Sequence, residues 1–125
     1  MYIVKFDYLD NGAKRSCGAF VSASSMEDCK AKVVGAFNGA EVTSMSRFDA
    51  ELFEVSEDCE DVWKVKVRTT VVDESKGREV ARNVVCLISQ SDFKAACLCA
   101  ERYADGFACG ADVVEVVRTD YVIII

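Results

Sequence analysis

The sequence contains no histidine, and this absence excludes a large part of enzyme chemistry. Without an imidazole there is no Ser–His or Cys–His nucleophile pair and no histidine general base. The seven cysteines include no Cys-x-x-Cys pair, so the usual ligands of a zinc site are missing as well. The sequence also lacks a Gly-rich phosphate loop and a nucleophile motif. We therefore expect a protein that is not an enzyme and that holds no metal and no cofactor.

Long apolar runs are also missing, since no segment approaches the roughly 18 apolar residues needed to cross a membrane. The N-terminal stretch Met1–Asp7 lacks the basic and then apolar layout of a signal peptide. We expect a cytoplasmic protein with no membrane partner. An odd number of cysteines in that compartment argues against disulfides and predicts reduced, buried thiols.

Basic residues are outnumbered, which gives a net charge of −6 and argues against nucleic acid as a partner. The excess is local, because seven acids and no Lys or Arg lie between Asp49 and Asp61. Outside this segment 14 acids face 15 bases, which is close to balance. The segment is interpreted as a solvated connector, and a docking strip for a basic partner is the alternative.

What the sequence does contain is one order of signals that occurs twice. An alternating run, a turn, a second apolar run, a serine-capped helix start and a closing strand occupy about 1–55 and then 62–125. The matched segments are Val4–Phe6 and Val65–Val67, Asp10–Lys14 and Asp73–Gly77, Ser25–Asp28 and Ser91–Lys94, and Arg47–Asp49 and Arg118–Asp120. This pattern predicts an α+β fold of tandem β-β-α-β repeats, with antiparallel sheets covered by two helices.

The expected strands are 2–9, 15–22 and 41–55 in the first repeat and 62–72, 79–89 and 112–125 in the second. Helices are expected to begin near Ser25 and Ser91. We expect 1–125 to be a single domain in which six strands share a core with both helices. The residues expected to point inward from the helices are Met26, Cys29, Val33 and Phe37, and then Phe93, Ala96, Cys97, Ala100 and Tyr103.

Three stretches of the second half carry a resemblance to a known family. Val62–Val67, Asp73–Gly77 and Ser89–Ala95 resemble an uncharacterised two-repeat family of gut Bacteroidetes and their phages. The resemblance covers nearly the whole chain in layout, and the family is catalogued only as a domain of unknown function. It implies a small cytosolic or phage-encoded protein without established enzymatic activity, and it supplies no catalytic residues.

A row of cations is the first candidate site. Lys64, Lys66 and Arg68 alternate along one strand, so they share one face over roughly 13 Å. Such a row can hold phosphates, and Lys5 is placed to extend it. The alternative is an ion-pair ladder, in which Glu115 or Asp7 on a neighbouring strand balances the charge.

Further candidates are two Arg-x-Asp pairs, one in each repeat. Arg47 with Asp49 and Arg118 with Asp120 can form ion pairs, because residues i and i+2 of a strand share a face. The two arginines would also suit a ligand with two phosphates, and Trp63 could supply a stacking ring.

Self-association is the expected use of the apolar C-terminal strand. Tyr121–Ile125 is apolar on both faces, and the second helix is rich in Ala and Cys. We expect a homo-oligomer formed through one of these surfaces.

The function expected from these features is non-enzymatic binding of a small anionic, nucleotide-like ligand. For a phage protein, a signalling nucleotide of host defence, sequestered in the host cytoplasm, is the natural candidate. A protein–protein interaction module, either an inhibitor of a host protein or a virion accessory protein, is the alternative.

Overall fold

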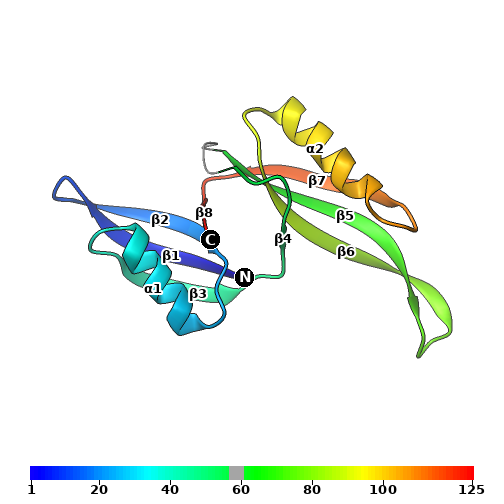
Figure 1. Ribbon diagram of the computed structural model, residues 1–125, viewed down its shortest axis with the longest axis horizontal. Coiled ribbons are helices and arrows are strands. Elements are labelled where there is room, and N and C mark those ends of the chain that lie inside the picture. The colour runs from blue at the N-terminus through cyan, green and yellow to red at the C-terminus, as the bar shows by residue number, and fades with distance from the viewer. Residues whose placement is uncertain (57–60) are drawn as a thin grey trace. The chain divides into compact units, whose positions relative to one another are not determined.

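An Asn-Gly turn and alternating apolar residues form the first hairpin of the chain. The computed structural model describes residues 1–56 and 61–125 (Figure 1). Strands β1 (Tyr2–Asp10) and β2 (Ala13–Val21) pair antiparallel around Asn11 and Gly12, which both have positive φ. On its other side β1 pairs antiparallel with β3 (Glu41–Arg47), and the register shifts by one residue between Lys5 and Phe6.

Helix α1 (Met26–Ala36) covers one face of this sheet. Ser25 caps it by accepting a 3.1 Å hydrogen bond from the backbone N–H of Asp28. Cys29 and Val33 are buried as expected, but Met26 is 54% exposed, because it lies in the first turn. Phe37 ends the helix and packs against Phe6, with ring centroids 4.8 Å apart.

The second hairpin consists of β5 (Val62–Asp73) and β6 (Arg78–Ser89), and β5 also pairs antiparallel with β7 (Ala111–Thr119). Trp63, Val65 and Val67 are buried, which confirms the predicted alternation. A register shift occurs between Lys66 and Val67, at the same place along the central strand as in the first sheet.

Helix α2 (Phe93–Asp105) packs on this second sheet and begins two residues after Ser91, where its start was predicted. Its cap is Asp92, which accepts a 2.8 Å hydrogen bond from the N–H of Ala95. Two expected inward positions are wrong, since Cys97 is only half-buried and Phe93 lies in the exposed first turn, where its ring contacts Trp63. The buried residues of the helix are Ala96, Cys99, Ala100, Tyr103 and Ala104.

Both predicted closing strands break, so residues 1–56 and 61–125 form eight strands instead of six. After β3 the chain forms the short strand β4 (Glu51–Leu52), and after β7 it forms β8 (Val122–Ile124). β4 pairs in parallel with β6, and β8 pairs in parallel with β2. The sheets therefore have the orders β3-β1-β2-β8 and β4-β6-β5-β7, and each contains one parallel pair where only antiparallel pairs were expected.

Because β4 joins the sheet of the second half of the chain and β8 joins that of the first, the chain forms two compact units. Unit 1 consists of Met1–Asp49 and Asp120–Ile125, and unit 2 of Ala50–Thr119. The buried side chains form two core clusters, one in each unit, where a single shared core was expected. The fold is α+β, as predicted, and the behaviour of the chain as one domain stays a prediction. Part of the expected acidic connector, 57–60, lies outside the described residues.

Candidate functional site

The described part of the acidic connector is bound to helix α2 and is not simply solvated. Arg102 Nη2 donates a 2.6 Å hydrogen bond to Glu54 Oε2, and the Cys99 thiol donates to the same oxygen at 3.1 Å. The hydrogen bond from Arg102, followed by that from Cys99, lowers the pKa of the Glu54 carboxyl. Glu51 accepts a 2.8 Å hydrogen bond from the Tyr103 hydroxyl. Two of the seven acids of this segment, for which a docking strip was the alternative interpretation, are therefore used inside unit 2.

The predicted cation row of β5 has the geometry of the ion-pair alternative. Lys64 Nζ lies 3.3 Å from Glu115 Oε1, and Lys66 Nζ lies 4.0 Å from Glu115 Oε2. Arg68 Nε donates a 3.4 Å hydrogen bond to Asn83 Oδ1. One carboxylate thus lies between two ammonium groups, and the use of this row for a ligand stays a prediction.

Trp63 and Arg118, the other predicted site residues of unit 2, do not join this row. Trp63 is buried on the opposite face of β5, and its indole N–H donates to the Gln90 carbonyl at 2.9 Å. Arg118 lies opposite Trp63 in the β5–β7 register, and Arg47 is exposed at the end of β3 in unit 1. Trp63 is thus a core residue of unit 2.

The predicted Arg-x-Asp ion pairs require the arginine and the aspartate to lie on one strand, but both strands end before the aspartate. β3 ends at Arg47 and β7 ends at Thr119, so neither Asp49 nor Asp120 belongs to the same strand as its arginine. Among the described residues, no ion pair joins Arg47 to Asp49. Asp120 is assigned to unit 1 and Arg118 to unit 2.

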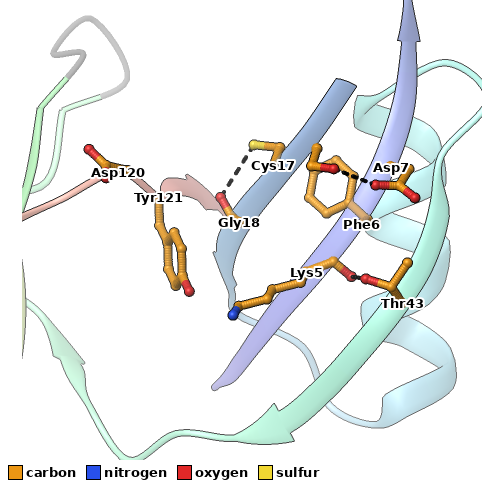
Figure 2. Close-up of a pocket in the computed structure, with 9 residues that line it drawn as sticks. Lys5, Phe6, Asp7, Cys17, Gly18, Thr43, Asp120 and Tyr121 are labelled. Atoms are coloured by element: carbon orange, nitrogen blue, oxygen red, sulfur yellow. Dashed lines mark hydrogen bonds between the residues drawn. The ribbon is translucent and has the colours of Figure 1, made fainter. Parts of the chain in front are cut away.

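A pocket of about 410 Å³ opens on the face of the unit 1 sheet opposite helix α1 (Figure 2). Its floor is formed by alternate residues of β1 and β2, whose neighbours in sequence point into the core. The C-terminal segment contributes a wall to the pocket. The lining residues are Lys5, Phe6, Asp7, Ser16, Cys17, Gly18, Thr43, Asp120 and Tyr121.

Lys5 is the cation of this pocket, and its surroundings differ from those of Lys66. Both lysines lie on the central strand directly before the register shift. Lys66 has Glu115 and Val85 as cross-strand partners, whereas Lys5 has Ser44 and Gly18. Within residues 1–56 and 61–125, Lys5 forms no ion pair. Its side chain is exposed and extends toward the phenol end of Tyr121 (Figure 2).

The two carboxylates that line the pocket are placed differently from each other. Asp7 Oδ1 accepts a 2.7 Å hydrogen bond from the Ser16 hydroxyl, and Lys14 Nζ lies 3.5 Å from Asp7 Oδ2. The Ser16 hydrogen bond is the main cause of the lowered pKa of Asp7. Asp120 is exposed, and its carboxylate points away from Lys5 (Figure 2). The negative charge nearest to Lys5 along β1 is therefore already balanced by Lys14.

Tyr121 forms the wall of the pocket because position 18 has no side chain. A Cβ added at Gly18 would overlap the edge of the Tyr121 ring. The same ring contacts Phe20, with centroids 5.2 Å apart, and Phe20 contacts Phe48 at 5.3 Å. A glycine inside a strand often marks such a close approach, and this was the sequence signal that could have indicated the pocket.

The fold and the pocket define a two-unit α+β protein with space for a small ligand in unit 1. Among the described residues, no group of His, Cys, Asp and Glu is arranged to hold a metal ion, and no helix has the length and hydropathy to span a membrane. Residues 14–125 match the family DUF4494, a domain of unknown function, and the chain belongs to this family. Comparisons with curated proteins and with solved structures gave no match.

Proposed function

We propose that the protein is a non-catalytic binding protein that captures a small anionic ligand in the pocket of unit 1. The observation that carries the proposal is the difference between Lys5 and Lys66. Lys66 shares the Glu115 carboxylate with Lys64, whereas Lys5 lines the pocket and has no ion pair among the described residues. An ammonium group on a pocket wall is a natural partner for a phosphate or a carboxylate.

The polar groups around Lys5 support an anion in spite of the acidic composition of the chain. Lys14 offsets the charge of Asp7, so Lys5 is left to attract the ligand. The Ser16 and Thr43 hydroxyls line the pocket, although both already donate within the sheet, to Asp7 and to the Lys5 carbonyl. They therefore offer oxygens that can accept hydrogen bonds from ligand hydroxyl groups.

We further propose that the protein is encoded by a phage of gut Bacteroidetes. It would sequester a signalling nucleotide in the host cytoplasm without cleaving it. The predicted ββαβ repeat is part of the proposal, and the matching element orders and register shifts of the two units support it. Self-association also stays a prediction, and both surfaces first considered for it have contacts inside the chain: β8 pairs with β2, and the Ala/Cys face of α2 packs on its sheet.

The test is to identify and then measure the ligand. The protein is purified from cells with active defence signalling and denatured, and the released small molecules are identified by mass spectrometry. Binding of the identified molecule is then measured by calorimetry in the wild type, in Lys5→Met and in Lys66→Met. Loss of a hydrogen bond to a charged group should weaken binding roughly 10- to 100-fold in Lys5→Met. Lys66→Met is the matched control and should bind normally, and equal effects of both changes would exclude the pocket as the site.

Exposed valines on β7 favour a second candidate function, a protein–protein interaction module. β7 is an edge strand, and Val113, Val114 and Val117 are between 37% and 48% exposed. Exposed apolar edges invite pairing with another chain. Under this candidate, Val114→Lys should abolish binding to a purified partner, while Lys5→Met should leave it unchanged.

A further inference from the structure

We infer that Tyr121 determines the specificity of the Lys5 pocket, and that the ligand carries a planar ring beside its anionic group. This inference rests on the proposed function, assigns recognition of the ring to Tyr121, and widens the ligand class from nucleotides to other ring-bearing anions. The class consists of small heteroaromatic or aromatic compounds that bear a phosphate or a carboxylate.

The first observation is that the cation and the ring are neighbours. Lys5 and Gly18 are cross-strand partners on β1 and β2, and Tyr121 occupies the space above Gly18. Directly paired residues of antiparallel strands lie about 5 Å apart, so an anion bound at Lys5 lies next to the phenol ring. Figure 2 shows the Lys5 ammonium directed toward the phenol end of Tyr121.

The second observation is that the ring is held in place before any ligand arrives. Tyr121 contacts Phe20, which is 2% exposed and also contacts Phe48. Strand β8, which follows Tyr121, pairs with β2, and the N–H of Ser22 donates a 2.9 Å hydrogen bond to the Ile124 carbonyl. A preorganised ring loses little conformational freedom when a ligand stacks on it, which favours binding.

The third observation is that the corresponding position of unit 2 has no such wall. Val122 pairs with Ala19 in unit 1, as Glu51 pairs with Cys86 in unit 2. The residue before Glu51 is Ala50, which takes the place of Tyr121, and Val85 takes the place of Gly18. The ring wall and the cation without an ion pair thus occur together in unit 1, which predicts one ligand per chain.

The experiment separates the contribution of the ring from that of the anion. The probes are 5′-AMP and 5′-GMP, which carry both groups, ribose 5-phosphate, which lacks the ring, and adenosine, which lacks the anion. Dissociation constants are measured by calorimetry for the wild type and for Tyr121→Leu. Stacking of a base on an aromatic side chain contributes ~1–3 kcal/mol, so at least one mononucleotide should bind at least about fivefold more tightly than ribose 5-phosphate. In Tyr121→Leu this advantage should disappear, while the affinity for ribose 5-phosphate is unchanged.

Two further variants keep the inference testable if Tyr121→Leu does not fold. Tyr121→Trp keeps a ring and should retain the preference for a mononucleotide. Gly18→Ala displaces the ring and should reduce that preference while Lys5 still holds the phosphate. Equal affinity for ribose 5-phosphate and both mononucleotides, or two ligands per chain, would overturn the inference alone. If no probe and no other ring-free anion binds the wild type, the proposed function fails together with it.

Discussion

The Tyr103 hydroxyl donates a 2.8 Å hydrogen bond to Glu51 Oε2, which joins helix α2 to the two-residue strand β4. The Tyr103 ring also contacts Phe53, with centroids 5.2 Å apart. Burial and the Glu51 carboxylate both raise the pKa of the Tyr103 phenol, so it stays protonated and able to donate. This contact adds to the backbone pairing that holds the two-residue strand beside β6.

Removal of this hydroxyl should destabilise unit 2. Tyr103→Phe deletes the donor to a carboxylate, and we expect a loss of about 1.5 kcal/mol in the free energy of unfolding, measured by urea denaturation. Tyr8→Phe is the matched control, because Tyr8 makes no side-chain hydrogen bond recorded within the described residues, and it should change stability by a few tenths of a kcal/mol at most. A Tyr103→Phe protein as stable as the control would show that the hydrogen bond contributes nothing.

Stability should fall in acid through Glu54. Its pKa is lowered from the usual 4.5, chiefly by the hydrogen bond from Arg102, so the folded state binds its proton less readily than the unfolded state. The contribution is therefore fully present above pH 4.5 and is lost as the pH falls below it. Glu54→Gln should flatten the stability profile in this range, and Glu74→Gln, in the exposed β5–β6 turn, should not. Identical profiles for the two variants would contradict the assignment.

The C-terminal strand should be part of the folded structure of unit 1. Ile123 pairs with Phe20 across β2 and β8, and it is half-buried. Ile123→Asp places a charge beside buried rings and should cost about 2 kcal/mol in unfolding free energy. Ile125→Asp is the control, because Ile125 is 64% exposed, and it should have little effect. If Ile123→Asp instead changes only the molar mass in light scattering, the strand serves an interface between copies.

The cysteines should differ in reactivity according to their burial. Burial is the largest cause that raises the pKa of Cys86 to about 12 and that of Cys99 to about 11, from the usual 9.0. In native protein we expect iodoacetamide to label the exposed Cys109 and to spare Cys29, Cys86 and Cys99, as measured by peptide mass spectrometry. In urea all seven should react, which provides the control. Rapid native labelling of Cys99 would contradict the packed geometry.

The ion pairs of Glu115 should contribute little and should be sensitive to salt. Lys64 and Glu115 are each about one third exposed, so screening by water limits their interaction to roughly 0–1 kcal/mol. A double-mutant cycle of Lys64→Ala and Glu115→Ala should give a coupling energy in this range that shrinks at 1 M NaCl. A coupling that is independent of salt would rule out an electrostatic origin.

Local patterns predicted the central parts of each unit. The alternation that buries Trp63, Val65 and Val67 is a property of a single strand, and the Asn11-Gly12 turn is determined by two adjacent residues. The helix caps were predicted to within one residue for the same reason, since Ser25 and Asp92 act on backbone groups three residues away. These features need no knowledge of the rest of the chain.

The breaks at Phe48 and Asp120 could not be predicted in this way. Segments 41–55 and 112–125 each have the composition of one long strand. The position at which each strand ends depends on the sheet edge of the other unit, with which the following residues pair. The pocket depends on the same crossing, because Tyr121 reaches Gly18 from the far end of the sequence. In the sequence Lys5 was therefore visible only as an extension of the cation row, in which Lys64 and Lys66 contact Glu115.

The exchange of β4 and β8 determines the order in which the two units can be completed during synthesis. Unit 2 is one continuous stretch, so all of its residues have been synthesised before Asp120–Ile125 are added. Unit 1 begins first but includes Asp120–Ile125, which are synthesised after the whole of unit 2. Unit 1 is therefore completed after unit 2, and its pocket acquires the Tyr121 wall only when β8 has paired with β2.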